Sequence, residues 1–266
     1  MDITQVRVAY FSPTGTTQAV ARAIADGIGC SDTEFLDITT PGARKQGLRI
    51  AGDQLLVMAV PVYMGRVPAL LKDWFDALKA RRTPAVCVVV YGNRAYENAL
   101  RELADLAASR GCIPVAGAAF IGEHSFSNPE QPASKGRPDG QDLAQARALG
   151  DAVRKRIESC ASVSGLDPVQ VPGERPYGGI TKLWDVDFIA VSDACVQCGL
   201  CAEVCPVGAV DPQDSRAVDA VKCVTCCACI RRCPQGARSI KPGPVKEAAK
   251  RLVTLYAEPK QPQCFL

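Results

Sequence analysis

The first half of the chain alternates short apolar runs with amphipathic stretches. The apolar runs cover Val6–Phe11, Asp53–Val60, Ala85–Tyr91 and Val115–Ile121, with a weaker one over Glu34–Ile38. Runs of this kind are typical of strands buried on both faces of a parallel sheet. Helical periodicity covers Thr17–Gly27, Val67–Ala80, Tyr96–Arg110 and Gln141–Ser159. The alternation predicts a doubly wound α/β domain.

Two irregular stretches follow this pattern. Ser125–Gly140 is polar and rich in Pro and Gly, which predicts a long loop after the fifth strand. Ser162–Asp187 has the composition of an extended linker, yet Pro176-Tyr177, Leu183-Trp184 and Phe188-Ile189 are apolar anchors that we expect to pack on the α/β domain. The expected divisions are an α/β domain over 1–160, a packed linker over 161–189, a cysteine-rich domain over 190–241, and a C-terminal helix and tail over 242–266.

The cysteine content changes this picture. Of the 14 cysteines in 266 residues, nine lie between Cys195 and Cys233. The N-terminus lacks the basic and apolar regions of a secretory signal, so a dense local cluster predicts metal or iron–sulfur ligation in a reducing cytoplasm. The net charge is +3 without a long run of one sign, which gives no indication of nucleic-acid binding. No apolar stretch is long enough to predict a membrane span.

The cysteine cluster contains an internal repeat. Cys195–Val210 aligns with Cys223–Arg238, with eight of sixteen positions identical, and both halves read C-x2-C-x2-C-x3-C-P. In bacterial iron–sulfur proteins the fourth cysteine of such a run ligates the other cluster. The predicted ligand sets are therefore Cys195, Cys198, Cys201 and Cys233 for one cluster, and Cys205, Cys223, Cys226 and Cys229 for the other. Zinc sites, the alternative, usually use two separated C-x-x-C pairs and match this spacing poorly.

The region from Ala190 to Ile240 resembles bacterial two-cluster ferredoxins. This resemblance implies two [4Fe–4S] clusters, each carrying single electrons. Cys227 is a ninth cysteine that occupies the repeat position of Gly199. We interpret it as a small residue in a tight loop, with ligand exchange or a redox-active thiol as the alternative.

A second motif follows the first predicted strand. The segment Tyr10–Thr17 places hydroxyl side chains at the start of a predicted helix, together with a glycine at position 15. Backbone N–H groups, the helix dipole and hydroxyl donors together form a cradle for a phosphate group. Simple capping of the helix is the plainer alternative. The loop has no Lys or Arg, which excludes a nucleotide-triphosphate P-loop.

This loop resembles the phosphate-binding loop of flavodoxins, and the resemblance extends over residues 5–158. It implies FMN as cofactor and the strand order 2-1-3-4-5. Pro61–Pro68 and Gly92–Tyr96 correspond to the two loops that line the flavin ring in that family. The residues expected to bind FMN are Ser12, Thr14, Gly15, Thr16, Thr17, Pro61, Val62, Tyr63, Met64, Gly65, Tyr91, Gly92, Asn93, Arg94 and Tyr96.

The sequence departs from flavodoxins within these loops. The tryptophan of the first flavin loop in many flavodoxins is absent, so Tyr63 or Met64 takes its place. Typical flavodoxins surround the flavin ring with acidic residues, whereas this chain has Arg66 and Arg94, for which a place on the solvated surface is the alternative. If these arginines face the flavin, they stabilise its anionic reduced form.

As a whole, the chain resembles flavodoxin–ferredoxin fusions of bacteria and archaea, which are frequent in anaerobes. The shared motifs include Gly122–Phe126, Arg137–Gly140 and Pro176-Tyr177. The resemblance implies a cytoplasmic electron-transfer protein that moves electrons between FMN, two [4Fe–4S] clusters and redox partner proteins. No G-x-G-x-x-G motif indicates a nicotinamide site, and no catalytic residue is assigned; the single histidine, His124, is expected to be structural.

Two other functions stay open. One is an FMN-dependent reductase, in which the clusters feed a flavin that reduces a small organic substrate and Ser125–Gly140 forms a lid. The other is a redox-responsive binding module, in which loss of a cluster alters a surface that binds a partner. The cluster meets the flavin either within one chain or across a homodimer.

Overall fold

The computed structural model describes residues 1–178 and 186–266, so the predicted anchor Leu183-Trp184 lies outside the described residues. A six-stranded sheet has the order β10-β7-β6-β4-β1-β2. Its strands are β1 (Gln5–Tyr10), β2 (Thr33–Asp37), β4 (Gln54–Pro61), β6 (Thr83–Tyr91), β7 (Cys112–Ile121) and β10 (Gln263–Phe265). All of them pair in parallel except β10, which pairs antiparallel with β7. The doubly wound fold and the strand order 2-1-3-4-5 are confirmed, and the C-terminal tail adds an edge strand that the sequence analysis did not predict.

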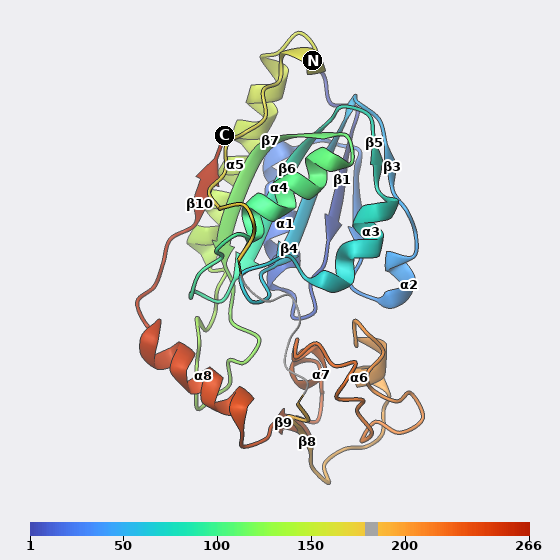
Figure 1. Cartoon of the computed structure of the whole chain (residues 1–266), viewed down its shortest axis with the longest axis vertical. Helices are drawn as coiled ribbons and strands as arrows, with labels where there is room; N and C mark the ends of the chain where they lie inside the picture. The colour runs from blue at the N-terminus through green and yellow to red at the C-terminus, as the bar shows by residue number, and fades with distance from the viewer. Residues whose placement is uncertain (179–185) are drawn as a thin grey trace.

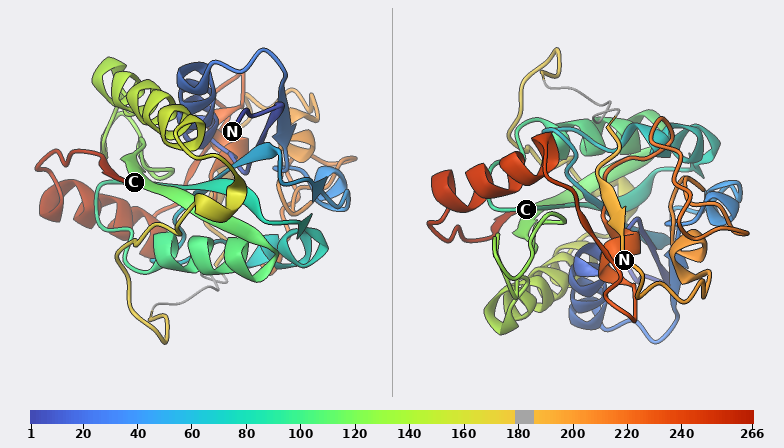
Figure 2. Two further views of the ribbon diagram at one scale, coloured as in Figure 1. Left: turned by 90° about the horizontal axis from the view of Figure 1, so that it is seen from above. Right: turned by 90° about the horizontal axis from the view of Figure 1, so that it is seen from below.

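Helices cover both faces of the sheet (Figure 1 and Figure 2). α1 (Thr16–Ile28) and α5 (Gly140–Glu158) lie on one face, and α3 (Lys72–Ala77) and α4 (Ala99–Ser109) lie on the other. α1 and α5 touch through their backbones at two glycines. A Cβ on Gly27 would lie 1.9 Å from the carbonyl oxygen of Arg147, and one on Gly150 would lie 2.1 Å from that of Ile24. Only glycine permits this approach.

The predicted helix over Val67–Ala80 is wrong at both ends. The backbone N–H of Val67 is held by the Glu102 carboxylate at 2.9 Å, so the chain leaves a turn there instead of starting a helix. A 3₁₀ turn over Ala69–Leu71 precedes the short α3. The far end forms β5 (Lys79–Ala80), which pairs with β3 (Arg49–Ile50), and α2 (Pro41–Arg44) is a single turn.

The segment after α5 packs along the sheet and α4. It passes through a 3₁₀ turn over Val163–Gly165, and Val169 and Val171 are then buried in the core beside β7. The N–H of Val169 donates to the carbonyl of Pro114 at 2.7 Å. The hydroxyl of Tyr177 donates to Asp105 of α4 at 2.5 Å. The described part of the predicted linker is therefore held on the α/β domain.

The cysteine-rich region is built from two similar halves. Each half has one short helix, α6 (Leu200–Glu203) or α7 (Ala228–Arg231), and the strands β8 (Ile189–Val191) and β9 (Arg238–Ile240) pair antiparallel. Left-handed backbone conformations recur 28 residues apart, at Gln197 and Thr225, Gly199 and Cys227, and Gly208 and Gly236. The sequence repeat is thus also a repeat of backbone conformation.

This region lies beyond the carboxyl ends of the parallel strands, as Figure 1 shows. α8 (Pro244–Leu255) follows it, and the chain then returns to the sheet as β10. Among the described residues, no helix combines the length and the apolar character needed to cross a membrane.

Candidate functional site

The loop between β1 and α1 presents several hydroxyl groups at a helix N-terminus. We call residues 11–17 the phosphate loop, after the group that the sequence predicts it to bind. Gly15 immediately precedes α1 with a φ of 94°, a left-handed conformation that favours glycine. The Ser12 hydroxyl accepts a hydrogen bond from the N–H of Gln18 at 3.0 Å, so Ser12 caps the helix. Thr14, Thr16 and Thr17 line an adjacent cavity instead. With no acidic residue in the first turn of α1, these groups suit an anion.

The loop after β4 is a tight hairpin. The backbones of Tyr63 and Arg66 exchange hydrogen bonds of 2.9 and 3.0 Å, and the two residues between them, Met64 and Gly65, both have positive φ. This is the pattern of a type I′ turn. Gly65 has a φ of 78°, which favours glycine, and a Cβ there would lie 1.9 Å from the Glu97 carboxylate, which would have to move. The turn projects an exposed Met64 side chain from its tip.

Tyr63 points back towards the phosphate loop and the cysteine-rich region. Its ring packs edge-on against Phe11, with centroids 6.3 Å apart. Burial raises the pKa of Tyr63 well above its usual value, and the neighbouring Cys226 and Cys227 raise it further. Tyr63 is therefore a half-buried neutral phenol between the loop and these cysteines.

Arg66 turns away from the cavity. It makes a bidentate ion pair with Glu102, with both N–O distances 2.8 Å, and its guanidinium lies 5.0 Å from the centroid of the Tyr177 ring. Arg66 thus joins α4 to the segment after α5. Arg66 lines neither cavity described below, so this geometry does not support the hypothesis that Arg66 faces the flavin.

The loop after β6 is held by the C-terminal tail. The buried side-chain amide of Asn93 donates to the carbonyls of Tyr256 and Glu258, both at 2.8 Å, and accepts from the N–H of Lys260 at 3.0 Å. The ring of Tyr96 packs against Tyr91, and its hydroxyl bonds to Gln263. Asn93 and Tyr96, both expected to bind FMN, therefore position the tail in this structure.

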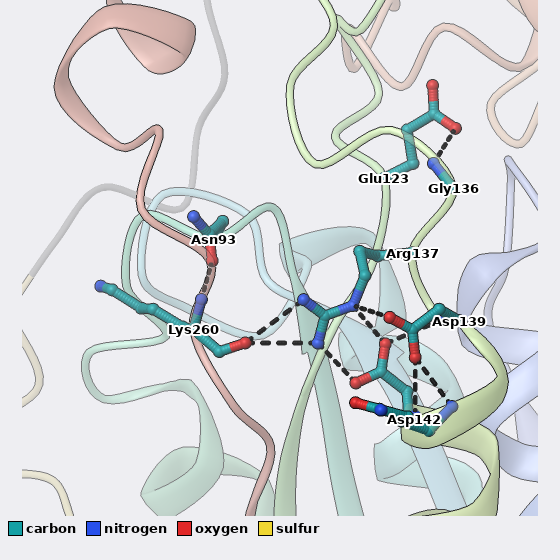
Figure 3. Close-up of polar contacts among 8 residues, drawn as sticks. Asn93, Glu123, Gly136, Arg137, Asp139, Asp142 and Lys260 are labelled. Carbon is teal, nitrogen blue, oxygen red and sulfur yellow. Dashed lines mark hydrogen bonds and ion pairs between the residues drawn. The ribbon is translucent and has the colours of Figure 1, made fainter.

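The motif at residues 137–140 fixes the same tail from the other side (Figure 3). Arg137 pairs with the buried carboxylate of Asp142 and donates to the carbonyl of Lys260 at 3.2 and 3.3 Å. Asp139 caps α5 by accepting from the N–H groups of Gln141 and Asp142. The second loop, the tail and α5 are thus joined through one set of hydrogen bonds.

The motif at residues 122–126 contacts the cysteine-rich region. Arg231 of α7 donates to the Glu123 carboxylate at 2.8 Å and to the carbonyl of His124 at 3.3 Å. Burial alone would raise the pKa of Glu123, but hydrogen bonds from Arg231 and Ser127 outweigh it and lower the pKa. Glu123 is therefore the charged partner of Arg231 in the contact between the two regions.

His124 lies at the same contact. Burial, together with the charges of Arg231 and Arg94, lowers its pKa to about 4. Its Nδ1 accepts from the N–H of Phe126 at 3.1 Å, so the proton of the neutral ring is on Nε2. His124 is neutral at pH 7.

A cavity of about 130 Å³ joins these elements. Its walls bring together the phosphate loop, the hairpin after β4, the ends of β6 and β7 and a cysteine of the second repeat half. The lining residues that decide its character are Thr14, Thr16, Thr17, Tyr63, His124 and Cys226. Of the other residues expected to bind FMN, Pro61, Val62, Met64, Tyr91 and Gly92 also line it.

A larger cavity of about 330 Å³ continues from the first. The two share Val62, Met64, Tyr91, Gly92, His124 and Phe126, and the second adds Gly65, Arg94 and α8. Leu252, Leu255 and Arg251 contribute the α8 wall. The sequence did not predict this contribution, because nothing in the local pattern of α8 indicates which surface it faces.

The cysteines gather around two separate hollows. Cys195, Cys198, Cys201 and Cys233 line one, and Cys205, Cys223, Cys226 and Cys229 line the other, together with Cys227. The structure therefore brings together the two sets expected from the repeat, including the fourth cysteine from the opposite half. Backbone N–H groups point at both of these fourth cysteines, from Ala209 to the Sγ of Cys205 at 3.1 Å and from Ala237 to the Sγ of Cys233 at 3.3 Å.

Side-chain chemistry at the hollow of Cys195, Cys198, Cys201 and Cys233 fits an anionic group. Arg238 is 4% exposed, and its Nε and Nη2 have no hydrogen-bond partner among the described residues. An unpaired buried cation is costly unless an anion neutralises it, and a cubane with four thiolates supplies that negative charge. Within the described residues, no three His, Cys, Asp or Glu side chains converge as the ligands of a single metal ion do.

Comparisons with known proteins agree with this geometry. The sequence of residues 189–211 matches the family described as "4Fe-4S binding domain", which favours an iron–sulfur group over zinc in the first repeat half. A comparison with curated protein sequences finds no match.

Similar solved structures cover the α/β domain. An archaeal flavodoxin is 14% identical, with a TM-score of 0.40, over 58% of this chain and 99% of its own. The flavodoxin of Megasphaera elsdenii is 16% identical, with a TM-score of 0.39, over 57% and 99%. An apo NADH:FMN oxidoreductase is 17% identical, with a TM-score of 0.40, over 62% and 95%. These likenesses are weak, and the strand order itself defines the fold.

Proposed function

We propose that the protein is an electron-transfer flavo-iron–sulfur protein that passes electrons between FMN, two [4Fe–4S] clusters and a redox partner protein. The observation that carries this proposal is the cavity shared by Thr14, Thr16 and Thr17 of the phosphate loop and Cys226 of the cysteine-rich region. A flavin held by that loop is adjacent to a cluster ligand.

The residues present suit each group. Thr14, Thr16 and Thr17, with the first N–H groups of α1, would hold the FMN phosphate. The hairpin after β4 and the loop after β6 would flank the ring, with Met64 in place of an aromatic residue. The two cysteine sets would each hold one cluster, the first with Cys195, Cys198, Cys201 and Cys233, and the second with Cys205, Cys223, Cys226 and Cys229.

The chain itself keeps the two regions in contact. Arg231 pairs with Glu123, Arg44 donates to the carbonyl of Pro206, and Lys246 of α8 lies 3.2 Å from the Glu130 carboxylate. The cysteine-rich region thus has polar contacts with α2 and with the segment after β7, and α8 adds a contact with the loop that contains Glu130. When bound, FMN supplies one- and two-electron chemistry and the clusters supply one-electron chemistry. Thiolate ligands must stay reduced, which suits the cytoplasm.

A second candidate function is reduction of a small organic substrate at the flavin. The cavity of about 330 Å³ between the second loop and α8 favours it, because Arg251 there offers positive charge beside apolar side chains; Arg94 also lines this cavity but pairs with Glu97. A substrate with a carboxylate and an apolar body suits this lining. The candidate requires that bound FMN leaves part of the cavity open.

The test has two stages on anaerobically purified protein. The first measures iron, acid-labile sulfide and FMN, with about eight irons, eight sulfides and one FMN per chain expected. The second reduces the clusters by rapid mixing and follows flavin absorbance over a range of protein concentrations. A rate that does not depend on concentration supports transfer within the chain, and a rate proportional to concentration contradicts it. Steady turnover of a small carboxylate acceptor would favour the reductase.

A further inference from the structure

Arg238 makes the two cysteine hollows unequal. It is the last residue of the repeat, and the corresponding residue of the first half is Val210. Arg238 lines the hollow of Cys195, Cys198, Cys201 and Cys233, whereas Val210 lines the hollow of Cys205, Cys223, Cys226 and Cys229. We call these the first and the second hollow. Among the described residues, no charged side chain lines the second hollow, although the charge of Arg238 also acts on Cys223 and Cys229 there.

The contacts of Arg238 direct it at the first hollow. Its Nη1 donates to the Sγ of Cys201 at 3.1 Å and to the carbonyl of Ser215 at 2.6 Å. The Ser215 segment is itself fixed, because the N–H of Ser215 donates to the side chain of Gln197 at 2.7 Å. Pairing of β9 with β8 holds the backbone of Arg238 opposite Val191. The guanidinium therefore has a defined position against a cysteine sulfur.

The remaining donors of this guanidinium are available to the group that the cysteines hold. Nε and Nη2 are buried and have no partner in the described part of the chain, and none of the ion pairs there includes Arg238. A positive charge and N–H donors beside an iron–sulfur group stabilise its reduced, more negative state. Hydrogen bonds to the sulfurs and local charge are among the factors that set the potential of such groups.

We infer that Arg238 raises the reduction potential of the cluster in the first hollow above that of the cluster in the second. The second hollow shares Cys226 with the cavity beside the phosphate loop, so the cluster of lower potential is the one nearer the flavin. A single electron would then pass from the cluster in the second hollow to the cluster in the first. This step would oxidise one cluster and reduce the other by one electron, with no proton or other reactant. This inference rests on the proposed function, because it requires both clusters.

The experiment is a redox titration of the full-length, cluster-loaded protein, followed by electron paramagnetic resonance. Wild-type protein is expected to show two separate midpoints. Arg238→Val reproduces the residue of the other half. It is expected to lower the higher midpoint by about a tenfold change in the reduction equilibrium, or about 59 mV for one electron, and to lower the other midpoint by less. Arg216→Val removes an exposed arginine of the same region and should leave both midpoints within error.

Three results would overturn the inference: one common midpoint in the wild type, unchanged midpoints in Arg238→Val, or an equal shift of both midpoints. If Arg238→Val loses iron, Arg238→Lys is titrated instead. Lysine keeps the positive charge but lacks the planar guanidinium, so a smaller shift of the same midpoint is expected. Absence of clusters in the wild type would instead contradict the proposed function, so the two failures are distinguishable.

Discussion

The guanidinium of Arg232 lies close to Gly15, although the two residues belong to different regions. Its Nη2 is 3.8 Å from the position that a Cβ would take on Gly15, at the start of α1. The phosphate loop itself has no Lys or Arg. Arg232 has no ion pair with an acidic group in the part of the chain that the structure describes. The cysteine-rich region thus places a free positive charge beside the loop.

We expect Arg232→Gln to weaken FMN binding about tenfold, because a charge-assisted contact with the phosphate is lost. Binding of riboflavin, which has no phosphate, should change less than about twofold. Flavin fluorescence during titration of the cluster-loaded protein measures both affinities, and Arg216→Gln is the control. Equal losses for the two flavins would show that Arg232 acts on the docking of the two regions and not on the phosphate.

Cys227 is expected to be dispensable for cluster binding. It has a φ of 57°, a left-handed conformation that costs a residue with a Cβ about 1 kcal/mol, whereas its repeat counterpart Gly199 has a φ of 77°. Cys227→Gly relieves this strain and leaves a small void in place of a buried thiol, so the free energy of unfolding changes little.

Iron and sulfide analysis checks this prediction. Cys227→Gly should keep the wild-type content, and Cys226→Ser, which alters the adjacent predicted ligand, should lose part of it. If Cys227→Gly itself lost about four irons, Cys227 would be a cluster ligand.

His124 should titrate with a pKa of about 4 in the folded protein, below the ordinary value of 6.5. Between about pH 4 and pH 6.5 His124 is protonated in the unfolded chain and neutral in the folded protein, so protons favour unfolding. The contribution of His124 to stability is therefore complete above about pH 6.5 and is lost as the pH falls to about 4, with a total of about 3 kcal/mol. Because the chain has one histidine, a single imidazole resonance in an NMR titration reports this pKa. A resonance that titrates near pH 6.5 would contradict the prediction.

Asn93→Ala should release the C-terminal tail. The variant loses three hydrogen bonds to the tail backbone, worth about 1 kcal/mol each. Amide hydrogen exchange should accelerate over 256–265, with little change in the central strands. Asn128→Ala is the matched control, because among the described residues the Asn128 side chain bonds only within its own loop. Unchanged exchange in the tail would mean that β10 pairing and Arg137 hold it alone.

Features that depend on short stretches of sequence were predicted correctly. The apolar runs specify the parallel strands, because a strand buried on both faces must be apolar throughout. The cysteine spacing and the repeat predicted which cysteines gather, since three cysteines within seven residues are held together by one loop. The prediction of a helix over Val67–Ala80 was wrong at its start, because Glu102, from another helix, accepts a hydrogen bond from the backbone N–H of Val67.

The sequence by itself determined the parts of this protein: the doubly wound sheet, the loop with hydroxyl groups before α1, and the two sets of cysteines. The tertiary structure alone decided how the parts meet. Arg231 and Glu123 are 108 residues apart in the chain, yet their ion pair helps place Cys226 beside the phosphate loop. Such contacts depend on which surfaces pack together, and arginines at 231, 232 and 238 are indistinguishable in a sequence until packing buries one and turns the others towards a different region.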